Sequence, residues 1–143
     1  MDKETRDPFD ILENEINKEM ESIYSKKTIS YAKNPINVGR MTDPDGAAYI
    51  KGLCGDSIEI YLIIKDNIIT EITFFSDGCG VTYACGSAVT ELSKGKDINF
   101  VLGISPKTII DYLEGLPDEH IHCSILAVSA LHKAIADYLL QRY

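Results

Sequence analysis

A pair of β-strand patterns joined by a short polar break constrains the middle of the chain. Residues 57–64 and 68–75 are rich in isoleucine, threonine, tyrosine and phenylalanine, and three polar residues separate them. This arrangement predicts an antiparallel β-hairpin. Because Cys54 and Cys79 are equally far from the centre of the break, closing the hairpin brings both thiols to its open end.

The residues beside these cysteines favour a binding site at that end. Each cysteine is next to a glycine, and glycine permits the backbone angles of a loop wrapped closely around a bound group. A carboxylate, Asp56, follows Cys54 two residues later. The open end of the predicted hairpin therefore holds two sulfur atoms and an oxygen.

The other elements are predicted to be one strand and several helices. Residues 47–51 form a strand candidate that pairs with the hairpin, giving three antiparallel strands, about the minimum for a stable sheet. Helical periodicity or capping residues mark five segments, which are residues 7–23, 80–94, 97–102, 105–114 and 123–139. The order of helix, strands and helices predicts an α+β fold with helices packed on one face of the sheet.

The first 23 residues are predicted to form a helical extension. Asp7 and Pro8 suit a helix start, and an apolar stripe follows that consists of Phe9, Leu12, Ile16, Met20 and Ile23. The segment is acidic, with eight Asp or Glu against three Lys or Arg. The stripe docks on the domain or else binds a partner or a second copy. The helix is expected to continue from Tyr24 to Tyr31 and to end at Asn34-Pro35.

Charge and cysteine content narrow the class of protein. The net charge of −8 argues against nucleic acid and anionic membranes as partners. No apolar run approaches the ~20 residues of a membrane span, and the polar start is unlike a signal peptide. The chain is therefore expected to be cytoplasmic. Four cysteines in a reducing compartment favour metal or thiol chemistry over disulfides.

A second pair of chemically active residues stands at the predicted start of the last helix. Cys123 follows His122 there, and the backbone N–H groups of a helix start favour a thiolate. If this helix end meets the open end of the hairpin, five residues converge: Cys54, Asp56, Cys79, His122 and Cys123. This donor set suits zinc or an iron–sulfur cluster. Reactive thiols without a metal, and inert buried cysteines, are the alternatives from the residues alone.

The chain also resembles the IscU/NifU-type scaffold proteins of iron–sulfur cluster assembly over residues 24–143. The resemblance rests on blocks in a fixed order, namely Tyr24-Ser25-Lys26-Lys27, Tyr31, Asn34-Pro35-Ile36-Asn37-Val38-Gly39, Cys54-Gly55-Asp56, Phe75, Gly78-Cys79-Gly80, Thr90-Glu91, Lys94-Gly95-Lys96, Leu116-Pro117, Ile121-His122-Cys123-Ser124-Ile125-Leu126-Ala127 and Ala136-Asp137-Tyr138. We therefore divide the chain into an N-terminal helical extension, residues 1–23, and a scaffold domain, residues 24–143.

The resemblance implies a carrier without enzymatic activity, on which a cluster is built and then handed on to apo-proteins. Sulfur arrives from a cysteine desulfurase, and Cys123 matches the cysteine that accepts it as a persulfide. The residues that match iron and cluster ligands are Cys54, Asp56, Cys79 and Cys123, with His122 nearby. The expected cargo is a 2Fe-2S cluster, with zinc able to occupy the same site. An electron donor such as a ferredoxin and a homodimer are further expectations.

Three features depart from this family's pattern. Cys85 stands where a serine is usual, and is either a buried inert thiol or an extra ligand or sulfur relay. Residues 116–120 replace a Leu-Pro-Pro-Val-Lys segment on which a dedicated Hsp70-type chaperone docks, which argues against that partnership. The third departure is the N-terminal extension.

His120 is interpreted as a surface residue or as a rim histidine that ligates or shuttles protons, and His132 as a surface residue.

Two other functions compete with the scaffold. A zinc-bound sulfur acceptor that activates a cysteine desulfurase would use the same cysteines. Relatives of that kind carry an insertion between the second and third cysteines and lack a histidine beside the last, whereas this chain has no such insertion and keeps His122. A hydrolase with Cys123 as nucleophile and His122 as base is disfavoured, because adjacent side chains rarely reach each other productively.

Overall fold

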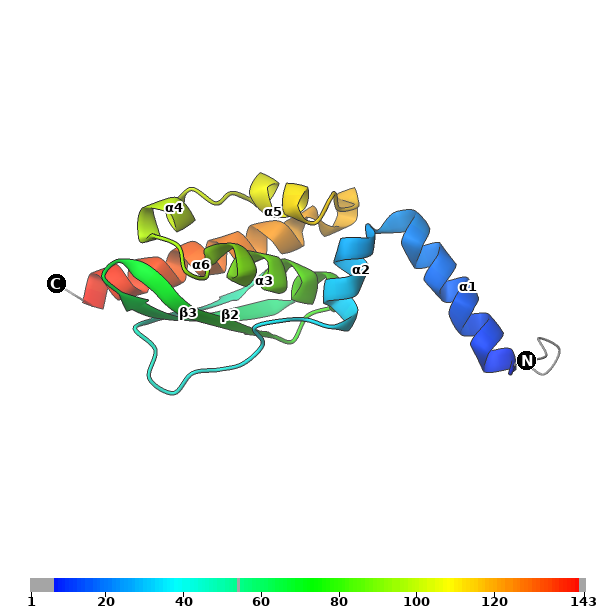
Figure 1. Cartoon of the computed structure of the whole chain (residues 1–143), viewed down its shortest axis with the longest axis horizontal. Helices are drawn as coiled ribbons and strands as arrows, with labels where there is room; N and C mark the ends of the chain where they lie inside the picture. Colours follow the sequence, from blue (N-terminus) through cyan, green and yellow to red (C-terminus); the bar gives the residue numbers. More distant parts are fainter. Residues whose placement is uncertain (1–6, 54, 142–143) are drawn as a thin grey trace.

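Three antiparallel strands and the helices on one side of them form the fold of the computed structural model, which describes residues 7–53 and 55–141 (Figure 1). The strands are β1 (Gly46–Lys51), β2 (Ser57–Lys65) and β3 (Ile68–Ser76). The helices are α1 (Pro8–Ile23), α2 (Lys26–Lys33), α3 (Gly80–Ser93), α4 (Ile98–Leu102), α5 (Pro106–Tyr112), the 3₁₀ turn η2 (Asp118–His120) and α6 (Ile121–Gln141). The predicted α+β architecture is confirmed.

The hairpin is formed by β2 and β3 as the sequence predicts. Its turn places Asp66 and Asn67 at φ of 53° and 64°, a left-handed conformation that Asp and Asn tolerate better than most residues. The strands pair antiparallel from Lys65 opposite Ile68 to Ile58 opposite Ser76. β1 adds to the other edge of β2, so the strand order is β1-β2-β3.

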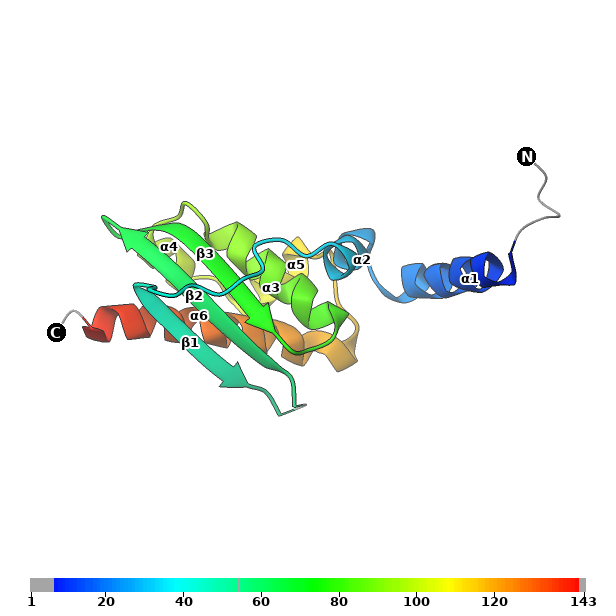
Figure 2. The ribbon, with the colours of Figure 1, turned by 90° about the horizontal axis from the view of Figure 1, so that it is seen from below.

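The hydrophobic core lies between one face of the sheet and two helices. Alternate residues of β2, including Ile58, Ile60 and Leu62, are fully buried, and α3 and α6 cover this face (Figure 2). Ten residues of α6 are buried. Within the described part of the chain, residues 118–141 alone are long and apolar enough to cross a membrane, but their buried side makes α6 a core helix of the domain.

The helix predicted to run on from Tyr24 to Tyr31 is interrupted, so that expectation is wrong. α1 ends at Ile23, and Tyr24 is in an extended conformation. The Ser25 hydroxyl then accepts a hydrogen bond from the Thr28 N–H at 3.0 Å and caps a new helix, α2. α2 ends at Lys33, in agreement with the stop expected at Asn34-Pro35.

α1 projects away from the rest of the domain (Figure 1). Asp7 caps it through the Phe9 N–H, as predicted, but none of its residues is buried. The exposed fractions of Phe9 and Ile23 are 78% and 56%, so the apolar stripe is not docked on the domain. Met20 is the stripe residue that lines a cavity next to the site described below.

Gly86 on α3 is where we expect a single methyl group to destabilise the fold. A Cβ atom there would lie 2.4 Å from Cε2 of Phe74, whose ring is fully buried against the helix. Gly86→Ala should lower the free energy of unfolding by about 1–3 kcal/mol, the usual cost of overpacking. Denaturant unfolding measures this. Gly52→Ala is the control, because its Cβ would make ordinary contacts at 3.5 Å; equal midpoints for the two variants would contradict the prediction.

Candidate metal centre

Cys79 is held by a loop that side-chain hydrogen bonds fasten to the end of the sheet. Asp77 Oδ1 accepts from the Ser57 N–H at 2.9 Å and from the Ser57 hydroxyl at 2.7 Å, and these bonds lower the pKa of Asp77. The Ser76 hydroxyl donates to the Ser57 carbonyl and accepts from the Gly78 N–H. Cys79 follows as the N-cap residue of α3, with an exposed side chain.

Cys123 is supplied by the start of α6. α6 begins at Ile121, two residues earlier than the sequence predicts, because η2 leads directly into it. Cys123 therefore lies in the first turn of the helix, where backbone N–H groups favour a thiolate. Its side chain is 1% exposed.

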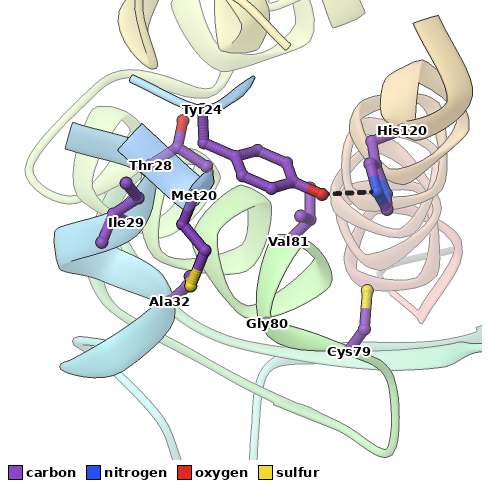
Figure 3. A pocket seen from close by; sticks show the side chains of 9 residues that line it. All are labelled: Met20, Tyr24, Thr28, Ile29, Ala32, Cys79, Gly80, Val81 and His120. Carbon is purple, nitrogen blue, oxygen red and sulfur yellow. Dashed lines mark hydrogen bonds between the residues drawn. The ribbon is translucent and has the colours of Figure 1, made fainter. Parts of the chain in front are cut away.

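These two cysteines meet a histidine that the sequence did not place among the principal ligands. One donor atom each of Cys79, His120 and Cys123 lie within 4.8 Å of one another. The sulfur of Cys79 and the ring of His120 face the same space, as Figure 3 shows. The predicted meeting of the hairpin end with the start of the last helix is thus present. Cys54, the remaining predicted thiol ligand, lies outside the described residues.

Asp56 is joined to the cysteines through a buried hydroxyl. Thr82 Oγ1 is 3.0 Å from Asp56 Oδ2, 3.7 Å from Cys79 Sγ and 3.6 Å from Cys123 Sγ. A hydroxyl has one hydrogen, and the shortest of these distances assigns it to the carboxylate. Asp56 therefore borders the site.

His122 is next to Cys123 in the chain, and its ring stacks on that of His120 with ring centroids 6.3 Å apart. Its Nε2 atom is 3.6 Å from Cys123 Sγ, but its side chain is exposed and lines a second cavity, of about 300 Å³, with Leu53 and Ile125. It does not belong to the group of described donors that all lie within 4.8 Å of one another. His122 thus contacts one of the two described thiols of the site.

An apolar cavity borders the donor group on the side of the N-terminal helices. It measures about 210 Å³ and is lined by residues of α1, α2 and the start of α3, together with Tyr24 and His120 (Figure 3). The Tyr24 hydroxyl lies 2.9 Å from Nε2 of His120. Burial, then the negative charges of Glu119 and of the two thiols, raise the pKa of Tyr24, so its hydroxyl remains protonated.

Of the site residues that the sequence did not place among the principal ligands, two have local signals. His120 and Cys123 are three apart on a continuous helical path, the spacing that brings side chains together. Thr82 has the same spacing from Cys79 at the start of α3. Tyr24 offers no such local signal, because it meets His120 only in the folded chain.

His132, expected at the surface, is partly buried, with its Nε2 atom 3.3 Å from the Val101 carbonyl oxygen.

Cys85 is a core residue of α3. Its side chain is fully buried, and burial, with smaller contributions from the charges of Cys123 and Cys79, raises the pKa of its thiol. A protonated thiol is neither a nucleophile nor a metal ligand. The structure therefore favours the buried inert thiol over the extra ligand or sulfur relay.

We expect alkylating reagents to distinguish Cys85 from Cys79. In the native, metal-free protein iodoacetamide should modify the exposed Cys79 and leave Cys85 unmodified until denaturant is added, because the reagent needs an accessible thiolate. Peptide mass spectrometry after timed labelling measures both sites in one sample. Native labelling of Cys85 at the rate of Cys79 would show that the Cys85 thiol is reachable and would revive its role as a relay.

The donor atoms define the chemistry that the centre can perform. Thiolates with an imidazole and a nearby carboxylate suit zinc or iron, whereas oxygen-only sites suit magnesium or calcium. The exposed Cys79 leaves one side of the centre open to solvent and to partners. The arrangement fits a group that enters and leaves.

Comparison with known proteins identifies the family of this chain. The model of the NifU-like N-terminal domain family matches residues 23–143. The iron–sulfur cluster assembly scaffold protein IscU 1 of Archaeoglobus fulgidus is 42% identical over 117 residues, which are 81% of this chain and 76% of that protein. The scaffold protein IscU of Escherichia coli K12 is 40% identical over 124 residues, 83% of this chain and 96% of that protein.

Solved structures agree on the fold. The N-terminal part of a NifU-like protein from Brucella abortus superposes with a TM-score of 0.70 at 18% sequence identity, covering 85% of this chain and 98% of that one. The family match spans most of the chain, and the two IscU relatives are similar over more than two thirds of it. This protein belongs to the family of NifU-like N-terminal domains.

Proposed function

We propose that this protein is a scaffold on which iron–sulfur clusters are assembled and from which they pass to apo-proteins. The observation that carries the proposal is the meeting of Cys79, His120 and Cys123 donors within 4.8 Å at an exposed end of the sheet. The names of the relatives, which are cluster assembly scaffolds, support the same role. The protein acts as a carrier and not as an enzyme.

The cargo is held by residues from both sides of the site. We propose Cys54, Cys79 and Cys123 as thiolate ligands, Asp56 as an oxygen ligand and His122 as a nearby imidazole, with a 2Fe-2S cluster as the product. Soft thiolates are the ligands that sulfide-bridged iron prefers. Cys85 has no role in this proposal beyond packing, because its thiol is buried and protonated.

Sulfur enters at Cys123. The Cys123 thiolate attacks the outer sulfur of a persulfide on a cysteine desulfurase, forming a new S–S bond while the desulfurase cysteine leaves as a thiolate. The position of Cys123 in the first turn of α6 supports this role, since helix-terminal N–H groups favour the attacking thiolate. An electron donor such as a ferredoxin then reduces the persulfide sulfur to sulfide.

The remaining expectations belong to the same proposal. The partners are a cysteine desulfurase and apo-acceptor proteins, and the compartment is the cytoplasm. Docking of a dedicated Hsp70-type chaperone is not part of it, because residues 116–120 lack the second proline and the lysine of the docking motif. The division into an extension of residues 1–23 and a scaffold domain of residues 24–143 stays a prediction, as does a homodimer.

Zinc is the competing occupant, since two thiols and an imidazole within 4.8 Å also suit a tetrahedral zinc site. A zinc-bound sulfur acceptor that activates a desulfurase is therefore the second candidate function.

Reconstitution separates the two. The purified, metal-free chain is incubated anaerobically with ferrous iron, cysteine and a cysteine desulfurase, and its absorption spectrum is followed. A visible cluster chromophore that an apo-acceptor then removes supports the scaffold. A colourless protein that retains zinc and raises desulfurase turnover would replace the scaffold by the sulfur acceptor.

A further inference from the structure

His120 is the imidazole most closely surrounded by the thiols of the site. It is the last residue of η2, and Cys123 follows in the first turn of α6, so both side chains share one side of a continuous helical path. Cys79 reaches the same space from the start of α3. These three residues form the one group of described histidine, cysteine and carboxylate donors that all lie within 4.8 Å of one another.

The two ring nitrogens of His120 have different surroundings. Nε2 lies 2.9 Å from the Tyr24 hydroxyl. Nδ1 is buried and has no hydrogen-bond partner among the described residues. A buried polar nitrogen without a partner is costly unless another group takes its lone pair. A metal ion accepts such a lone pair.

The Tyr24 hydroxyl completes the arrangement that metal-bound histidines usually have. A ligating imidazole typically donates its other N–H to a hydrogen-bond acceptor, which fixes the tautomer and the direction of the ring. Tyr24 Oη is placed to accept from Nε2–H, and this leaves the lone pair of Nδ1 for the metal. The tilted contact of the two rings, with centroids 5.6 Å apart, further restricts the imidazole.

We propose that Nδ1 of His120 is a ligand to the divalent metal ion that Cys79 and Cys123 hold, with Tyr24 as a positioning residue. Two thiolates and an imidazole suit Zn²⁺, Co²⁺ and Fe²⁺. In cluster assembly this is the site where Fe²⁺ first binds; that role rests on the proposed function, whereas metal binding does not. His122 is exposed and lies outside this group of three, although its Nε2 atom is 3.6 Å from Cys123 Sγ.

Cobalt titration of the metal-free, full-length chain tests the site. Co²⁺ bound by thiolates gives sulfur-to-metal charge-transfer absorption, which reports affinity directly. His120→Gln should weaken Co²⁺ binding by at least about tenfold, because even the loss of a hydrogen-bonding partner of a ligand costs 10–100-fold. Tyr24→Phe should weaken it by about tenfold, with little further loss when His120→Gln is already present. His132→Gln is the matched histidine control and should bind like wild type.

Nitrogen-15 labelling of histidine provides a second readout. In the Zn²⁺-loaded protein, long-range proton–nitrogen spectra should show His120 with Nε2 protonated and Nδ1 bound to metal. Unchanged Co²⁺ affinity in His120→Gln, a larger loss in His122→Gln, or a protonated Nδ1 on His120 in the loaded protein would each overturn the proposal. Thermal unfolding of the metal-free variants verifies that they remain folded.

The two proposals fail in different ways. If the wild-type chain binds Co²⁺ through His120 but no cluster forms with iron and desulfurase, the scaffold function fails and the metal site stands. If His120→Gln binds Co²⁺ like wild type while clusters form and transfer normally, the site fails and the scaffold function stands.

Discussion

Cys123→Ser should abolish persulfide formation on this protein and reduce cluster retention by at least about tenfold. The sulfur step needs a thiolate, and Cys123 is the cysteine in the first turn of α6, where N–H groups stabilise one. Its replacement also removes one of the two described thiols of the site. Loss of a hydrogen-bonding partner of a ligand lowers metal affinity 10–100-fold, and loss of the ligand itself should cost more.

The measurement has two parts. Incubation with a cysteine desulfurase and cysteine, without iron, followed by mass spectrometry, locates the persulfide. Anaerobic reconstitution then gives cluster occupancy. Cys85→Ser is the matched control: it changes a thiol that is buried in the same hydrophobic core and should leave both readouts close to wild type. A persulfide found on Cys85 and absent from Cys123 would refute the assignment.

Asp56→Ala should hold its cluster longer than wild type and transfer it several-fold more slowly to an apo-acceptor. A carboxylate is a hard, weak ligand for iron that is bound to sulfide and thiolates, so it eases release. Asp56→Cys should strengthen both effects, because a fourth thiolate is the ligand set of stable clusters.

The contacts of Asp56 argue for this role against a purely structural one. If Asp56 only stabilised the turn after Cys54, it would accept from backbone N–H groups. Among residues 7–53 and 55–141, its carboxylate accepts instead from the Thr82 hydroxyl, next to both described thiols of the site. Asp77 is the carboxylate that fastens the chain locally, through Ser57.

Cluster lifetime and transfer rate for the Asp56 variants decide between the two roles. Asp97→Ala is the control, because Asp97 caps α4 beside Ile68 at the turn end of the hairpin; it should lower stability through the lost cap and leave transfer unchanged. Faster cluster loss in Asp56→Cys, or Asp56→Asn behaving as wild type while Asp56→Ala is merely less stable, would show that Asp56 is a turn former.

Local chemistry explains which parts of the fold could be predicted. The hairpin follows from residues 57–75 alone, since two strand patterns and an Asp-Asn turn determine it. The break between α1 and α2 was also encoded locally, in the capping serine Ser25, but the apolar pattern on both sides concealed it. An apolar stripe such as that of α1 shows that a helix has a face suited to burial, and does not show what covers it.

The candidate site was predictable as a region but not in its full set of side chains. Equal spacing about the turn and the start of the last helix brought Cys79 and Cys123 together, as expected. His122 drew attention because it is adjacent to Cys123, whereas the side chain of His120 faces both described thiols. That difference depends on where η2 joins α6, and helix starts are the boundaries that sequence patterns define least well.

The described donors of the site come from the N-cap of α3, from η2 and from the first turn of α6, and Cys79 meets the other two only when the chain is folded. The unfolded chain has the same side chains without their arrangement, so a bound ion favours the native state. Such linkage adds about 2.7 kcal/mol when the free ion is at one hundred times its dissociation constant. Delivery of the cargo removes this contribution. Transfer of the cargo to an acceptor therefore returns the carrier to the stability of its empty form. The empty carrier unfolds more often and is then more accessible to proteases.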